Sequence, residues 1–82
     1  MEKRIGVIGI VIENKENVAR LNSLLSEFAD CIIGRMGVPY REKDLSIISL
    51  IVDGTMDEIG ALTGKLGSLK GILVKTALTK LS

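Results

Sequence analysis

The chain has 82 residues, of which 46% are hydrophobic and 26% are charged, and its formal net charge at pH 7 is +1. This length fits a single domain over residues 1–82, and the high apolar fraction excludes the composition of a disordered chain. The balanced charge lacks the basic excess of proteins that neutralise phosphates, so we expect no direct nucleic-acid partner.

The first expected strand covers residues 5–12, where every residue is apolar or glycine and Ile and Val predominate. Such a composition is typical of a strand that is buried on both faces. A membrane span needs about twenty apolar residues, so this run is too short to cross a bilayer and we expect no membrane partner. Asn14 follows as the expected N-cap of an amphipathic helix. The apolar stripe of that helix consists of Val18, Leu21, Leu25 and Phe28.

The second expected strand covers residues 32–39 and contains Gly34, Gly37 and Pro39. Because glycine weakens a strand and proline cannot donate a ladder hydrogen bond, we expect this strand at an edge of the sheet. A polar connection of hairpin length follows at residues 40–44. The next run, residues 45–52, is again dense in Ile, Leu and Val, which predicts a third, buried strand.

Thr55 and Glu58 have the spacing of a capping box at the start of a second amphipathic helix. The apolar stripe of this helix consists of Ile59, Leu62, Leu66 and Leu69. The sequence Gly-Ala-Leu-Thr-Gly-Lys at residues 60–65 is not a phosphate-binding loop, because its two glycines are too close together. We interpret its small residues as a surface that lets the helix approach a neighbour. Residues 72–78 predict a half-exposed fourth strand.

The two helical stripes repeat at a constant offset of 41 residues, which indicates an internal βαβ duplication. The element order is βαββαβ, and the two most apolar strands, the first and the third, belong at the centre of the sheet. This order predicts an α+β, ferredoxin-like sandwich. We expect a four-stranded antiparallel sheet of order 4-1-3-2 with two helices on one face.

The two central strands carry apolar side chains at both odd and even positions, whereas the two helices can cover only one face. The other face should therefore be apolar and uncovered. An exposed apolar patch of that size is unusual on a monomer. We expect a homo-oligomer, a dimer or higher, or another protein that covers this face.

Two residue types restrict the chemistry of the chain. It contains no histidine, which removes Ser/His and Cys/His nucleophile pairs and histidine metal sites. Cys31 is the single cysteine, so one chain can form neither a disulfide nor a four-thiolate metal site. We expect no enzyme, no catalytic residue, no metal and no cofactor, and a reducing cytoplasmic location. Cys31 precedes two isoleucines, which indicates a small buried apolar residue rather than a nucleophile.

Four stretches of the chain resemble a known family. They are Arg-Ile-Gly-Val-Ile-Gly-Ile-Val-Ile at 4–12, Ile-Ile-Gly-Arg-Met-Gly-Val-Pro-Tyr at 32–40, Ser-Ile-Ile-Ser at 46–49 and Ala-Leu-Thr-Gly-Lys-Leu-Gly at 61–67. From about Arg4 to Thr76 the chain is similar to the regulator family of the iron-only hydrogenase system. The resemblance implies an ACT-like fold related to the regulatory domain of the nickel-responsive repressor.

The same resemblance implies a regulatory protein, with a hydrogenase maturation or regulatory protein as its partner. Two hypotheses remain open at this point. One is an oligomeric ACT-like regulatory module that responds to a small ligand, and the other is a ligand-free assembly or scaffold protein for hydrogenase maturation.

Two regions are candidates for binding a small ligand. ACT-like domains usually bind their ligand at the loop after the first strand, which here contains Asn14 and Lys15 before a helix N-terminus. The second region is the edge around Arg35, Tyr40 and Arg41, where the two arginines can hold a carboxylate or phosphate. Plain helix capping and solvation are the alternatives for both regions.

Overall fold

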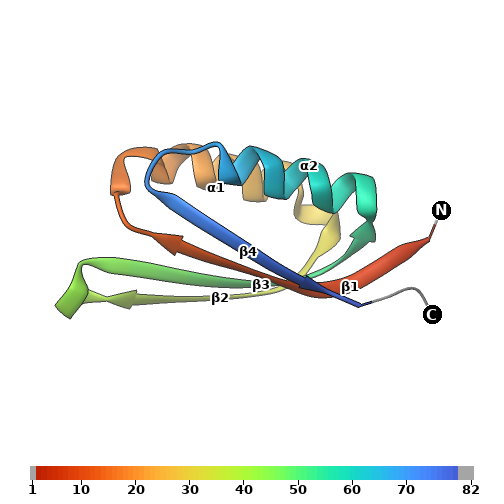
Figure 1. Ribbon diagram of the computed structural model, residues 1–82, viewed down its shortest axis with the longest axis horizontal. Helices are drawn as coiled ribbons and strands as arrows, with labels where there is room; N and C mark the ends of the chain where they lie inside the picture. The colour runs from red at the N-terminus through yellow and green to blue at the C-terminus, as the bar shows by residue number, and fades with distance from the viewer. Residues whose placement is uncertain (1, 80–82) are drawn as a thin grey trace.

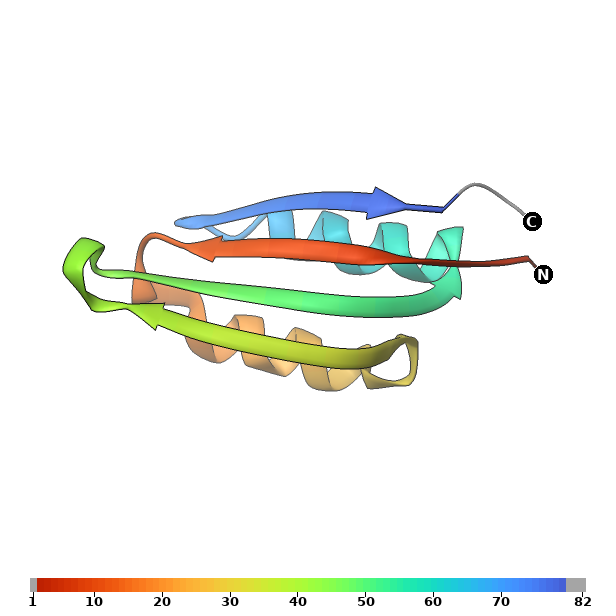
Figure 2. The same ribbon diagram turned by 90° about the horizontal axis from the view of Figure 1, so that it is seen from below.

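Four antiparallel strands form one sheet, and two helices pack on the same face of it (Figures 1 and 2). The computed structural model describes residues 2–79. The strands and helices are β1 (Lys3–Ile12), α1 (Val18–Glu27), β2 (Ile32–Tyr40), β3 (Leu45–Thr55), α2 (Met56–Gly67) and β4 (Ile72–Leu78). The strand order β2-β3-β1-β4 is the expected order 4-1-3-2, so the ferredoxin-like fold class is confirmed.

The predicted cap of the second helix is confirmed, whereas the N-cap of α1 is Asn17, without a side-chain hydrogen bond, and not the predicted Asn14. Thr55 Oγ1 accepts a hydrogen bond from the amide of Glu58 at 3.1 Å, and the Glu58 carboxylate accepts one from the amide of Thr55 at 2.9 Å. This confirms the capping box. Asn14 Oδ1 accepts from the amide of Glu16 at 2.8 Å. Asn14 thus caps a short 3-10 turn, Lys15–Asn17, which leads into α1.

The core lies between the sheet and the two helices. Leu21 of α1 and Leu62 of α2, which occupy equivalent positions in the two halves, are both completely buried. They pack against the side of the sheet formed by alternate residues of the central strands, among which Ile8, Ile10, Leu50 and Val52 are also fully buried. Each fully buried side chain of this kind contributes about 1.5–3 kcal/mol. No helix within residues 2–79 is long and apolar enough to cross a membrane.

The opposite side of the sheet has no covering layer in the structure, and Figure 2 looks onto it. We call this surface the free face; its larger apolar residues are Ile5, Val7, Val11, Met36, Val38, Ile47, Ile51 and Leu73. The register places Val11, Ile47 and Val38 side by side on β1, β3 and β2. Met36 is 65% exposed and Leu73 is 53% exposed. The expectation of an uncovered apolar face is therefore confirmed.

The small residues of α2 do not lie against a neighbouring element. A Cβ atom added at Gly60 or Gly64 would meet nothing within 4 Å. The interpretation that these glycines bring α2 close to a neighbour is wrong for the described chain, because the apolar stripe on the other side of the helix makes the contact with the sheet.

Replacing Gly64 by alanine should stabilise the fold. Alanine loses less backbone entropy than glycine in a helix, so we expect Gly64→Ala to raise the free energy of unfolding by about 0.5–1 kcal/mol. Urea denaturation measures this change. Gly71→Ala is the matched control: Gly71 has a φ of +82° and an added Cβ would lie 2.5 Å from Cβ of Asn14, so this variant should be destabilised. A destabilised Gly64→Ala would contradict the exposed position of that glycine.

Candidate functional site

A groove of about 300 Å³ opens on the helix-covered side of the sheet, between α1 and the distal parts of β2 and β3. Lys15 and Arg35, which come from the two separate regions proposed from the sequence, both line it. We call it the α1–β2 groove; its lining residues are Ile12, Lys15, Val18, Leu21, Asn22, Arg35, Gly37, Val38, Pro39, Ser46, Ile47 and Ile48.

The groove exists because α1 is shorter than the strands beneath it. α1 has 10 residues and is about 15 Å long, whereas β2 has 9 residues and is about 30 Å long. The hairpin of β2 and β3 therefore runs past the start of α1 (Figures 1 and 2). Gly37 adds no side chain to this uncovered part: a Cβ placed there would still be 3.9 Å from Ile48.

An irregularity in β2 decides which face Arg35 occupies. The pairing of β2 with β3 shifts between Ile32 and Gly34. An extra residue at this point changes which side chains of β2 share a face. With regular pairing from Ile32 onwards, Arg35 would lie opposite Ser49, on the free face. It lies instead opposite Leu50, which is completely buried, so Arg35 is on the side that the helices cover.

The groove carries positive charge without a compensating carboxylate. Arg35 Nη2 donates a hydrogen bond to Oδ1 of Asn22 on α1 at 3.4 Å. The residues that line the groove include no Asp or Glu. Across residues 2–79 the one ion pair joins Lys65 and Glu27 at 3.1 Å, so Lys15 and Arg35 have no acidic partner there. The arrangement favours an anion near these two cations.

The other three residues proposed from the sequence lie outside the groove. Asn14 uses its side chain for the cap described above, and its Cβ lies beside Gly71. Tyr40 ends β2, and Arg41 begins the 3-10 turn at the tip of the hairpin. The structure therefore brings Arg35 together with Lys15, and not with Tyr40 or Arg41.

Sequence reasoning missed two polar residues that line the groove, Asn22 and Ser46. Asn22 is indistinguishable in the sequence from other polar residues on the outer side of α1. Gly37 was noted as a strand-weakening residue, and its spacing from Arg35 is the one feature that places both on the same side of β2.

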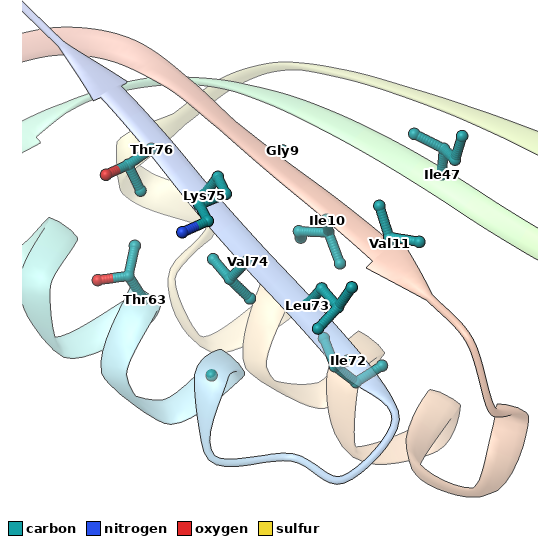
Figure 3. A pocket seen from close by; sticks show the side chains of 11 residues that line it. Gly9, Ile10, Val11, Ile47, Thr63, Ile72, Leu73, Val74, Lys75 and Thr76 are labelled. Carbon is teal, nitrogen blue, oxygen red and sulfur yellow. The ribbon is translucent and has the colours of Figure 1, made fainter.

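A larger hollow, of about 760 Å³, runs along the edge strand β4 (Figure 3). Its lining comes from both sides of that strand: Leu73 lies on the free face, whereas Val74 lies on the helix-covered side, where Thr63 of α2 also lines the hollow. Lys75 is the one charged residue among the described residues that line it. This hollow is the open edge of the sheet, and it lacks the converging polar groups of the smaller groove.

Cys31 is buried, with 2% of its surface exposed, and its Sγ donates a hydrogen bond to the carbonyl of Phe28 at 3.3 Å. Burial, together with the carboxylates of Glu58 and Asp30, raises the pKa of the thiol. These features match a packed apolar side chain. In the described part of the chain, no three His, Cys, Asp or Glu side chains lie close enough to hold a metal ion.

Comparison with known proteins shows the family of the chain. A family model described as "Iron-only hydrogenase system regulator, putative" matches residues 4–76. The chain belongs to this TM1266-like family. The solved structure of TM1266 from Thermotoga maritima is 44% identical and has a TM-score of 0.90. That alignment covers 96% of this chain and 100% of TM1266. The family description names a regulator.

More distant structures share only the fold. CPII from Thiomonas intermedia K12, a nitrogen regulatory PII-like protein, is 15% identical with a TM-score of 0.51, over 93% of this chain and 91% of CPII. A formyltetrahydrofolate deformylase from Pseudomonas putida KT2440 is 10% identical with a TM-score of 0.62, over 89% of this chain and 28% of the deformylase. Among proteins with curated descriptions, none matches the chain.

The raised pKa and the burial of Cys31 predict low thiol reactivity. Because less thiolate is present and the sulfur is covered, the folded protein should react with the disulfide reagent DTNB at pH 8 on the order of tenfold or more slowly than the chain unfolded in urea. Absorbance of the released thiolate measures both rates, and Cys31→Ser gives the background. Equal rates in the folded and unfolded chain would contradict the buried position.

Proposed function

We propose that the protein is an oligomeric ACT-like regulatory module of the iron-only hydrogenase system, which responds to a small ligand by changing how it engages a partner protein. The observation that carries this proposal is the free face. Family membership supports the regulatory role and the system in which it acts.

The free face fits a second copy of the chain. Two small residues, Gly9 and Ser49, pair at its centre, and the same row continues to Met36 beside Ser49 and to Lys75 beside Gly9. Two sheets that pack face to face lie about 10 Å apart, and small central residues allow this approach. Asp53, opposite Ile5, and Lys75, on β4, lie on the same face with opposite charges. In a two-fold dimer the aspartate of one copy can face the lysine of the other.

The second hypothesis is a ligand-free assembly or scaffold protein for hydrogenase maturation. In that case a maturation protein covers the free face. The two hypotheses differ in what stabilises the protein. A ligand-responsive module gains thermal stability when its small ligand binds, whereas a scaffold gains it only from its protein partner.

Placing a carboxylate on the free face should separate two copies. Ile51 is 38% exposed on this face, and burial of an unpaired charge there is costly. We expect the parent to be a dimer at micromolar concentration and Ile51→Glu to weaken association by at least about a hundredfold. Light scattering measures the mass, and circular dichroism checks the fold.

The matched control for this variant is Met56→Glu, which places the same charge on an apolar residue that is 46% exposed at the start of α2, outside the free face. This control should remain dimeric. A parent protein that is monomeric and does not aggregate would overturn the proposed dimer, as would a control that dissociates like Ile51→Glu.

The role in the hydrogenase system is tested by deleting the gene and measuring both hydrogenase transcript and hydrogenase activity. A regulatory module should change the transcript level or the activity of fully matured enzyme, and the parent gene should restore it. Unmatured hydrogenase with unchanged transcript would favour the scaffold hypothesis. No change in any of these quantities would contradict both hypotheses.

A further inference from the structure

We infer that the α1–β2 groove binds a small organic anion that has a carboxylate or phosphate at one end and a short apolar body. This inference rests on the proposed function, because it names the chemical class of the regulatory ligand. It depends on the two cations, on the apolar walls and on the size of the groove.

Lys15 and Arg35 form the cationic end of the site, which would hold the anionic end of the ligand. They are twenty residues apart in the sequence, yet both line the groove, and within residues 2–79 neither has a carboxylate partner. Arg35 carries five N–H donors, of which one is directed to Asn22. The remaining donors and the Lys15 ammonium are available to an oxyanion, which arginine holds well through paired hydrogen bonds.

Arg35 is exposed on the edge strand β2, and it lies on the helix-covered side of the sheet. Arg35 pairs with Leu50 on β3, and Leu50 pairs with Ile8 on β1; both of these neighbours are completely buried. The hydrogen bond to Asn22 directs the guanidinium towards α1. The irregular pairing at Gly34 brings Arg35 to the helix-covered side, where it lines the groove.

The rest of the groove fits an apolar body. Ile12, Val18 and Ile48 supply aliphatic walls, and Gly37 leaves the space between them open. The Ser46 hydroxyl adds one polar group at the same site. A volume of about 300 Å³ is at the lower end of the range for small-molecule pockets, so the site fits a small molecule rather than a dinucleotide.

Titration of the ¹⁵N-labelled protein with phenyl phosphate and, separately, with benzoate tests the site by NMR. These probes share the ring and differ in the anion, and benzyl alcohol provides the uncharged control. We expect saturable shifts of the amides at 15–22, 35–38 and 46–48 with at least one of the two anions. Benzyl alcohol should give no saturable shift, and inorganic phosphate alone should bind more weakly than phenyl phosphate.

Two variants test the residues. Arg35→Gln keeps a polar side chain but removes the charge, and it should weaken binding about tenfold or more. Arg41→Gln, the same substitution at the hairpin tip, should leave the affinity unchanged. Gly37→Leu should fill the groove and abolish binding. The stability of all three variants is checked by thermal unfolding.

The inference is overturned if neither anion binds the parent protein in the millimolar range or below. It is also overturned if the shifts map to the free face, or if Arg41→Gln weakens binding as much as Arg35→Gln. These outcomes leave the mass measurement and the hydrogenase measurements intact, so failure of the site is distinguishable from failure of the proposed function. Failure of the site together with unmatured hydrogenase and an unchanged transcript level would favour the scaffold hypothesis.

Discussion

The structure depends on the burial of one side of a single sheet by two short helices. Alternate residues of β1 and β3, such as Ile8 and Leu50, are completely buried beneath Leu21 and Leu62. Because successive side chains of a strand point to opposite faces, the same strands must present their other residues on the opposite side. The residues of β1 and β3 that point away from the helices are also mostly apolar, and they form the free face. Two helices on the other side of the sheet cannot cover it.

The small area that the two helices cover also produces the α1–β2 groove. The hairpin of β2 and β3 extends further than α1 does. The part of its helix-covered side that α1 does not reach therefore stays open next to Lys15 (Figures 1 and 2). The two surfaces share their strands. Gly37 and Ile48 pair on the groove side, whereas the adjacent Val38 and Ile47 belong to the free face by register and also line the groove. A ligand that shifts this hairpin therefore acts on both surfaces, which gives the proposed regulation a direct physical route.

Charge distinguishes the groove from the larger hollow along β4. Volume alone would favour the hollow, but its lining divides between two sides of the edge strand and includes Lys75 as its one charged residue within the described chain. The smaller groove brings two cations and an amide to one side of a hairpin. Since specific binding sites combine apolar walls with a few converging polar groups, the chemistry of the lining is the better guide.

The sequence by itself determined the elements, the strand order, the capping box and the apolar character of both sheet faces. These features follow from local periodicity or from short spacings in the sequence. The repeat of the two helical stripes supports the same order of strands and helices. Which cations converge was decided only by the tertiary structure. The face of Arg35 depends on the irregular pairing at Gly34, and a glycine in a sequence does not reveal whether the register shifts there. The shift turns Arg35 towards α1 and Lys15, because one extra residue in a strand exchanges the faces of all the side chains that follow it.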